Sequence, residues 1–271
     1  MTELRADMSD PSNVVPNPWQ DLRQFTQARI ALGRSGVSLP TSAQLEFQLA
    51  HARARDAVYH ALDVAALAQV LDQAGHDCQL VHSACQDRDH YLQRPDLGRK
   101  LNTESRLQLG QLPHRPGDLA LVIADGLSAF AIEQNVPPFL SQLRGSLTQD
   151  GWSLAPIVIA QQGRVAIGDE IAELLGARAV VVLIGERPGL SSPDSMGLYF
   201  TWAPRMGLTD ANRNCISNIR PAGLSYEAAA YRLCYLLVEA RTRGISGVDL
   251  KDETISSASA VGDSARNFLL G

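Results

Sequence analysis

The chain has 271 residues, of which 45% are hydrophobic and 20% are charged, and its formal net charge is −5. This length and composition are typical of a folded protein with a sizeable core in one or two domains, and they exclude disorder throughout. The negative charge argues against a general nucleic-acid or anionic-membrane surface, because phosphate groups favour a basic partner.

We expect the chain to act in the cytoplasm. No apolar run approaches the roughly 20 residues that a membrane-spanning helix needs. Residues 1–18 mix charged residues with prolines and lack the apolar stretch of a secretory signal. We therefore expect partners that include neither a membrane nor nucleic acid, and we expect the four cysteines to be reduced thiols.

Helical spacing dominates the first third of the chain. Trp19, Leu22, Phe25 and Ala28 recur at helical intervals, and Gly33 is a plausible stop. The pattern predicts a first helix that begins near residue 19.

Two further helices follow. Thr41 and Gln44 form a capping-box pattern with Thr41 as the N-cap, and the helix that they open places Leu45 and Leu49 on one apolar face. A third helical pattern covers residues 63–75. Together these patterns predict a helical N-terminal segment over residues 19–76.

From residue 77 onward, short apolar runs alternate with helical patterns. The runs predict strands at residues 119–124, 155–159 and 179–184, and residues 77–83 read as a further strand. The helical patterns cover 130–147, 168–175 and 225–243, with a break expected at Pro137 and Pro138. Continuous rather than alternating apolarity is typical of strands buried on both faces in parallel sheets. The order of elements indicates an α/β fold with an open, doubly wound, mostly parallel sheet.

Ligands of open α/β sheets bind beyond the carboxyl ends of the strands. Three turns should meet there, at residues 125–128, 162–165 and 185–190. Their glycines let the backbone approach a ligand closely, and the N–H groups that follow can bind anions. The same residues also suit ordinary strand-to-helix turns. The turns therefore indicate a ligand site without identifying its ligand.

Several other chemistries lack their usual residues. The chain has no dinucleotide-binding G-x-G-x-x-G, no phosphate loop and no nucleophile elbow, and all six histidines precede residue 115. Cys215 lacks a neighbouring histidine that would activate it as a nucleophile. Zinc-ligand types also gather in one stretch, but their spacing matches no standard zinc site: His76, Cys78, His82 and Cys85. We expect no protein metal site.

The later part of the chain contains a series of specific strings. In order, these are RPDLGR at 94–99, ADGLS at 124–128, GRV at 163–165, ELLGA at 173–177, GERPGL at 185–190, APR at 203–205 and NCISNI at 214–219. Together they resemble the light chain of adenosylcobalamin-dependent ethanolamine ammonia-lyase, and weaker similarity reaches back to residues 32–34.

The resemblance implies a division of labour between two chains. A heavy chain, built as a barrel, holds ethanolamine and carries out its radical deamination to acetaldehyde and ammonia. The light chain is a Rossmann-like cobalamin-binding subunit that covers one side of adenosylcobalamin, and it is expected to be inactive alone and to hold no catalytic residue. The chain lacks the Asp-x-His-x-x-Gly string that replaces the lower axial base. The resemblance therefore implies base-on cobalamin, with the cobalt held by the corrin.

Carried over by motif, the cobalamin contacts of the family fall on Val165, Glu186 and Cys215. Corrin side-chain amides carry N–H donors, which the carboxylate of Glu186 can accept in a charge-assisted hydrogen bond. Backbone groups at Val165 and Cys215 could meet further amides or the nucleotide tail.

The residue patterns suggest how the chain is divided, and the resemblance suggests what its domain binds and where it works. We expect a flexible N-terminus at 1–18, the helical segment at 19–76, a Rossmann-like cobalamin-binding domain at 77–252 and a flexible tail at 253–271. The N-terminal extension is shorter than in relatives that are targeted to a bacterial microcompartment, so encapsulation stays open.

Two other functions stay open at this point. One is a stand-alone α/β hydrolase or transferase, which would need a nucleophile–base pair or a phosphate loop. The other is a non-catalytic assembly or regulatory subunit that has lost its cofactor. An interface with a heavy chain would favour exposed aromatic residues, for which Tyr199 and Trp202 are candidates.

Overall fold

The computed structural model describes residues 13–112 and 117–254. These residues form two compact units: one contains residues 13–55 and Gly189–Ser192, and the other contains 56–112, 117–188 and 193–254. Most of the two ends that were expected to be flexible, residues 1–12 and 255–271, lies outside the described residues. No helix in the described part is both long and apolar enough to cross a membrane.

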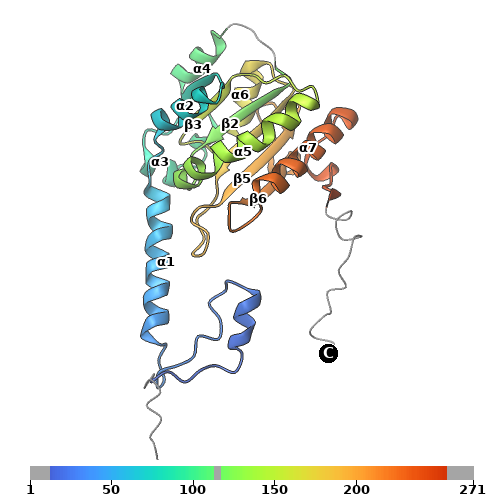
Figure 1. The fold of residues 1–271 in the computed structure, drawn as a ribbon. Helices are drawn as coiled ribbons and strands as arrows, with labels where there is room; N and C mark the ends of the chain where they lie inside the picture. The colour runs from blue at the N-terminus through green and yellow to red at the C-terminus, as the bar shows by residue number, and fades with distance from the viewer. Residues whose placement is uncertain (1–12, 113–116, 255–271) are drawn as a thin grey trace, which may run out of the picture. The chain divides into compact units, whose positions relative to one another are not determined.

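The first unit has little regular structure (Figure 1). It contains a short 3-10 helix, η1 (Gln20–Phe25), and the beginning of helix α1 (Thr41–Tyr59), which continues into the second unit. Paired hydrogen bonds join the backbones of Val15 and Arg34, at 2.7 and 3.0 Å between nitrogen and oxygen. No residue of η1 is buried.

The sequence-based predictions for this unit were partly wrong. The first helix is only a 3-10 segment, with the side chain of Phe25 71% exposed, because a short helix without a packing surface is marginal. Helix α1 begins one residue earlier than expected, since Thr41 is its first residue and not its cap. Its expected apolar face is also exposed, at 58% for Leu45 and 51% for Leu49.

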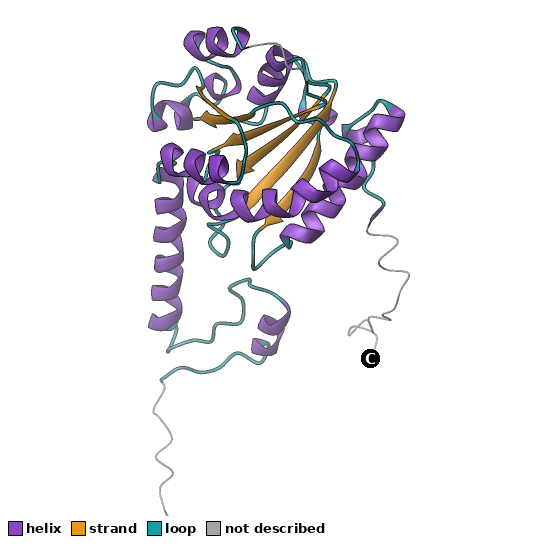
Figure 2. Ribbon diagram, turned by 45° about the horizontal axis from the view of Figure 1, so that its top comes forward, coloured by secondary structure: helices purple, strands orange, loops and turns teal. Residues whose placement is uncertain are grey.

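The second unit is built on a six-stranded mixed sheet (Figures 1 and 2). The strands of the described chain are β1 (Cys78–His82), β2 (Leu119–Ala124), β3 (Ile157–Gln161), β4 (Ala179–Gly185), β5 (Met196–Trp202) and β6 (Asn214–Ile219), in the spatial order β1-β3-β2-β4-β5-β6. The first four are mutually parallel, as the continuous apolar runs of β2, β3 and β4 predicted. Strands β5 and β6 are antiparallel to their neighbours and were not predicted.

Helices pack against both faces of this sheet (Figure 2). Helices α2 (Val64–Gln73), α5 (Ala129–Gln149) and α7 (Tyr226–Arg243) cover one face, and α4 (Thr103–Gly110) and α6 (Ile167–Leu175) cover part of the other. The remaining short elements are α3 (Arg88–Gln93), η2 (Leu97–Arg99), η3 (Asp210–Asn212) and η4 (Gly247–Asp249). The fold is therefore α/β, with one hydrophobic core on each side of the sheet.

The helix boundaries show which local signals were reliable. Asp63 and Ser225 cap α2 and α7 with their side chains, and Gly244 ends α7 in the left-handed region, with φ at 69°. The break expected at Pro137 and Pro138 is absent, because α5 runs continuously through both. Nine residues of α5 are buried, and this packing outweighs the local cost of the prolines.

Candidate functional site

The three turns expected to meet do so at the carboxyl ends of β2, β3 and β4. The carboxylate of Asp125 accepts hydrogen bonds from the backbone N–H groups of Gln162 and Gly163, at 2.9 and 3.1 Å. The N–H of Leu127 donates to the carbonyl of Gly185 at 2.9 Å. One buried carboxylate and one backbone bond thus join turns that lie far apart in the sequence.

Two glycines make this meeting possible. A Cβ atom on Gly126 would collide with the carbonyl of Gly185, and one on Gly185 would collide with the carbonyl of Ser128. The atoms in the way belong to the backbone and cannot move aside cheaply. Glycine at these positions therefore reflects close packing between turns.

A layer of arginine and tyrosine supports the same edge of the sheet. The ring of Tyr91 lies between two guanidinium groups, whose carbons are 4.8 Å (Arg88) and 4.3 Å (Arg164) from its centre. The Tyr91 hydroxyl donates to the carbonyl of Gly163 at 3.2 Å, and burial raises the pKa of this hydroxyl. Arg88 also donates to the carbonyl of Gly126 at 2.8 Å, so this layer holds two of the three turns in place.

The carboxylate of Glu186 is held by residues that return to this edge from later strands. Its Oε2 atom accepts from the hydroxyl of Ser195 at 2.5 Å and from the backbone N–H of Asn218 at 3.2 Å. The backbone N–H of Glu186 donates to the carbonyl of Ser195 at 2.9 Å. Residues at the ends of β4 and β6, and the residue before β5, therefore surround one half-buried carboxylate.

Beside the carboxylate lies a part of the sheet that no helix core covers. Along β5, Met196, Leu198 and Phe200 face the core of α5 and α7, so Tyr199 faces the opposite side. Cys215 lies opposite Tyr199 on the edge strand β6 and is exposed, like Ser217. We call the surface formed by Tyr199, Cys215 and Ser217, next to the buried Gly197, the open face.

Electrostatics connect the residues of the open face. The pKa of the Tyr199 hydroxyl is raised, first by burial, then by the neighbouring Cys215 thiol and by the charge of Glu186. The thiol of Cys215 also lies 3.2 Å from the hydroxyl of Ser217. The arrangement offers a phenol, a thiol, a hydroxyl and a carboxylate to a ligand that lies across β5 and β6.

A buried ion pair fixes the sheet on the same side as the open face. Arg213 donates two hydrogen bonds to the carboxylate of Asp169, both at 2.7 Å, and a third to the hydroxyl of Thr201 at 3.1 Å. The side chains of Arg213 and Asp169 are only 1% and 2% exposed. This pair joins the first turn of α6 to β5 and to the residue before β6.

The comparison with protein families identifies the chain. A family model for the ethanolamine ammonia-lyase light chain matches residues 16–251 of this chain. The chain belongs to the ethanolamine ammonia-lyase light-chain family. It is thus a subunit of a carbon–nitrogen lyase that consists of two kinds of chain.

This chain is similar to individual light chains over almost their whole length. The chain is 59% identical over 268 residues to the ethanolamine ammonia-lyase small subunit of Azotobacter vinelandii, with 97% of this chain and 99% of the relative covered. It is 59% identical over 262 residues to that of Pseudomonas putida, covering 94% and 96%. It is 57% identical over 273 residues to that of Ralstonia nicotianae, covering 100% of both chains.

The structure places the three residues expected at a cofactor site of the lyase light chain on one side of the sheet. Val165 lies in the turn between β3 and α6 and, like Tyr199, packs against the core of that side. Glu186 follows β4 and lies beside Gly197, where an added Cβ would come within 2.7 Å of its Oε1 atom. Cys215 lies on the open face.

Sequence reasoning missed Ser195 and Gly197. Neither belongs to a recognised motif, and both became visible only because β5 returns beside β4 and brings them onto Glu186. No clear signal marked them, because the residues of Met196–Trp202 are buried except for the half-buried Tyr199 and Trp202, and burial of this kind depends on the neighbouring strands.

The described part of the light chain does not bring together the residues that a metal site or a nucleophile–base pair would need. Within residues 13–112 and 117–254, no group of three or more His, Cys, Asp or Glu side chains could hold a metal ion. No histidine ring in these residues is hydrogen-bonded to a hydroxyl or thiol side chain. The aromatic candidates for an interface, Tyr199 and Trp202, are half-buried and not fully exposed.

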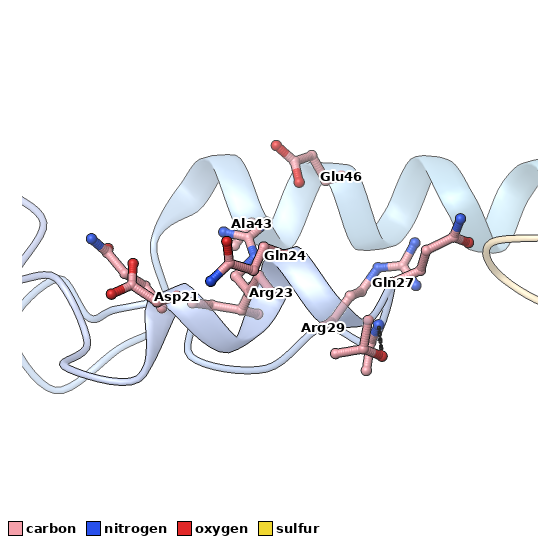
Figure 3. A pocket seen from close by; sticks show the side chains of 11 residues that line it. Asp21, Arg23, Gln24, Gln27, Arg29, Ala43 and Glu46 are labelled. Carbon is pink, nitrogen blue, oxygen red and sulfur yellow. Dashed lines mark hydrogen bonds between the residues drawn. The ribbon is translucent and has the colours of Figure 1, made fainter. Parts of the chain in front are cut away.

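The first unit has a hollow of its own, of about 670 Å³, which sequence reasoning did not predict. Figure 3 shows polar side chains from η1 and the segment after it, such as Arg23, Gln24 and Gln27, together with Glu46 of α1. Its charged residues are Asp21, Arg23, Arg29 and Glu46. These side chains form no nucleophile–base pair or metal-binding group, so the hollow suggests no reaction.

Proposed function

We propose that this light chain binds adenosylcobalamin jointly with the large subunit of ethanolamine ammonia-lyase, through Val165, Glu186 and Cys215. The assembled enzyme converts ethanolamine to acetaldehyde and ammonia, with the substrate held mainly by the large subunit. The light chain orients and covers the cofactor and has no activity alone.

The observation that supports this proposal best is the half-occupied carboxylate of Glu186. Its Oε2 atom accepts two hydrogen bonds, whereas no described residue donates to Oε1. The corrin side chains of cobalamin carry amide N–H groups, and a hydrogen bond from an amide to a carboxylate is stronger than one between neutral groups. Oε1 is thus a suitable acceptor at the ligand-binding edge of the sheet.

The open face fits the rest of a corrin. A corrin is broad and flat, with methyl groups and amides around its edge, and the open face combines the half-buried ring of Tyr199 with the exposed polar atoms of Cys215 and Ser217. When bound, adenosylcobalamin supplies the radical chemistry, while the protein supplies position and exclusion of water. The cobalt would be held by the corrin and its own dimethylbenzimidazole, base-on, so no protein ligand to a metal is required.

The roles of the chain's own residues follow from their positions. Glu186 would fix the orientation of the macrocycle by accepting an amide proton at Oε1. The buried pair Arg213 and Asp169 would keep β5 and β6 rigid beneath the ligand. Tyr199 would present its hydroxyl as an O–H donor and not as a charge, and its raised pKa favours the same protonated form.

The first test is ammonia release from ethanolamine in the presence of adenosylcobalamin. The light chain alone, the large subunit alone and their mixture are compared at equal concentrations. We expect activity only in the mixture. Activity of the light chain alone would support a stand-alone enzyme, and co-purification of two chains that stay inactive would support an assembly subunit.

The second test is direct binding of cyanocobalamin to the assembled complex, measured by equilibrium dialysis. Glu186→Ala should raise the dissociation constant about tenfold, because it removes a charge-assisted hydrogen bond. Glu239→Ala on α7 is the matched control, since this carboxylate lies on a helix of the opposite face and should leave binding unchanged. Unchanged binding in Glu186→Ala would argue against the proposed contact.

We also propose that residues 77–252 form a Rossmann-like, doubly wound cobalamin-binding domain behind the helical segment 19–76. Four parallel strands with helices on both faces support this assignment. The cytoplasm, with or without a bacterial microcompartment, is the proposed location. Fusing a fluorescent protein to the light chain and imaging cells grown on ethanolamine would distinguish a diffuse from a punctate distribution.

A further inference from the structure

We propose that Ser195 is a positioning residue, whose hydroxyl orients the carboxylate of Glu186 so that Oε1 faces the cofactor. The inference rests on the proposed function, because Ser195 gains this role only if Glu186 binds cobalamin. Ser195 lies outside every motif that indicated the family, and it is expected to act only through Glu186.

Two hydrogen bonds join Ser195 and Glu186. The backbone N–H of Glu186 donates to the carbonyl of Ser195 at 2.9 Å, and the hydroxyl of Ser195 donates to Oε2 of Glu186 at 2.5 Å. The next pair along the two strands, Gly185 and Met196, is in antiparallel register. The serine hydroxyl is therefore fixed relative to the backbone that carries the glutamate.

The only other hydrogen bond to the Glu186 carboxylate from a described residue is weaker. The backbone N–H of Asn218 lies 3.2 Å from Oε2, which is near the upper limit for a hydrogen bond. Without the hydroxyl, a glutamate side chain with three rotatable bonds would keep one long contact and would sample several orientations. Binding a ligand would then require the carboxylate to be ordered again, which lowers affinity.

Ser195 is itself held by a buried polar network. Asn135 on α5 donates to the carbonyl of Asp194 at 2.8 Å and accepts from the hydroxyl of Tyr226 at 2.8 Å. Arg220 donates to the carboxylate of Asp194 at 3.3 Å. The residue next to Ser195 is thus tied to α5, to α7 and to the end of β6. Only 5% of Ser195 is exposed, so the solvent does not compete effectively for its hydroxyl.

The experiment is a double-mutant cycle on the assembled two-chain complex. The dissociation constant of cyanocobalamin is measured for the unmodified complex, Ser195→Ala, Glu186→Ala and the double variant. We expect Ser195→Ala to weaken binding about three- to tenfold when Glu186 is present, as for one lost hydrogen bond. In the Glu186→Ala background the same change should alter binding less than about twofold.

Two controls separate positioning from general stability. Ser105→Ala removes another buried hydroxyl, also 5% exposed, which accepts from the N–H of His82 on α4's side of the sheet. It should lower the thermal midpoint like Ser195→Ala and leave cobalamin binding unchanged. Ser195→Thr keeps the hydroxyl and should bind cobalamin more tightly than Ser195→Ala.

The outcomes are distinguishable. Weaker binding in Ser195→Ala only when Glu186 is present supports the inference. Weaker binding in Glu186→Ala, combined with no effect of Ser195→Ala or an equal effect in both backgrounds, overturns the inference and leaves the proposed function in place. Unchanged binding in Glu186→Ala overturns both.

Discussion

The two faces of one sheet differ in how completely helices cover them. On the closed face, α2, α5 and α7 bury an apolar core that includes Phe139 and Phe200. On the opposite side, the core of α4 and α6 lies over β1 to β4, and beyond it Tyr199 on β5 is half-buried while Cys215 and Ser217 on β6 are exposed. The closed face consists of apolar side chains in contact, whereas the open face combines the half-buried ring of Tyr199 with the exposed side chains of Cys215 and Ser217.

This difference indicates that the residues that stabilise the fold and the residues proposed to bind a ligand lie on opposite faces of the sheet. Apolar burial stabilises the fold without regard to any ligand, so changes on the closed face should act on unfolding. The open face has few such contacts to lose, so changes there should act on binding.

The largest effect is expected in the closed core. Phe139 on α5 is 0% exposed, and Phe139→Ala should lower the free energy of unfolding by about 3–5 kcal/mol, through lost burial and a residual cavity. Tyr231→Ala on the outer side of α7 is the control, since this residue is 63% exposed and should change the free energy by less than about 0.5 kcal/mol. Urea denaturation followed by tryptophan fluorescence measures both. Equal losses would contradict the assignment of the core.

The next effect concerns the buried ion pair beside the open face. Asp169→Asn removes the buried charged partner of Arg213, leaves only the exposed Asp210 at 3.7 Å, and should cost about 3 kcal/mol of unfolding free energy. The exposed pair of Arg94 and Asp96 provides the control, and Asp96→Asn should leave the denaturation midpoint unchanged. A small effect of Asp169→Asn would mean that water reaches Arg213.

A smaller effect concerns the reactivity of the cysteines on the two faces of the sheet. Burial, with help from Asp77 and Asp72, raises the pKa of Cys78 to about 11, and Cys78 packs against the closed-face core. Cys215 is exposed on the open face. At pH 8 a maleimide should therefore modify Cys215 at least about tenfold faster than Cys78, as followed by mass spectrometry. Addition of the large subunit and cobalamin should protect Cys215, and continued labelling would count against a covered site.

The smallest effect tests the space beside Glu186. A Cβ at Gly197 would lie 2.7 Å from Oε1, so Gly197→Ala should displace the carboxylate and weaken cyanocobalamin binding about threefold. Gly145→Ala on α5 is the control, because nothing lies within 4 Å of its added Cβ. This control should leave binding unchanged and stabilise the helix by up to about 1 kcal/mol. Equal binding in both variants would mean that Glu186 adjusts freely.

Local sequence signals predicted the interior of the second unit well. Strands β2 and β4 were recognised because their residues are buried on both faces, which produces an unbroken apolar run. Helix α7 was predicted from its helical pattern over residues 225–243, and the structure has it at Tyr226–Arg243. The continuity of α5 through Pro137 and Pro138 was predicted wrongly, since the packing that maintains it involves distant strands.

The candidate site was predictable only in outline. The convergence of three turns follows from parallel strands, whose carboxyl ends share one edge of the sheet. The contact between Ser195 and Glu186 depends on the antiparallel return of β5, and the loop between them gave no signal of that pairing. The exposure of Leu45 and Leu49 was also unpredictable, because periodicity shows that a helix has an apolar side and not what covers it.

The sequence by itself determined the α/β class, the parallel core strands, most helix ends and the family of this light chain. Each of these is written in neighbouring residues, as apolar runs, caps or ordered strings. Only the tertiary structure decided that β5 and β6 extend the sheet in the antiparallel sense, that one face stays open, and that Ser195 holds Glu186. These features come from contacts between segments distant in the chain, whose free energy no local pattern records.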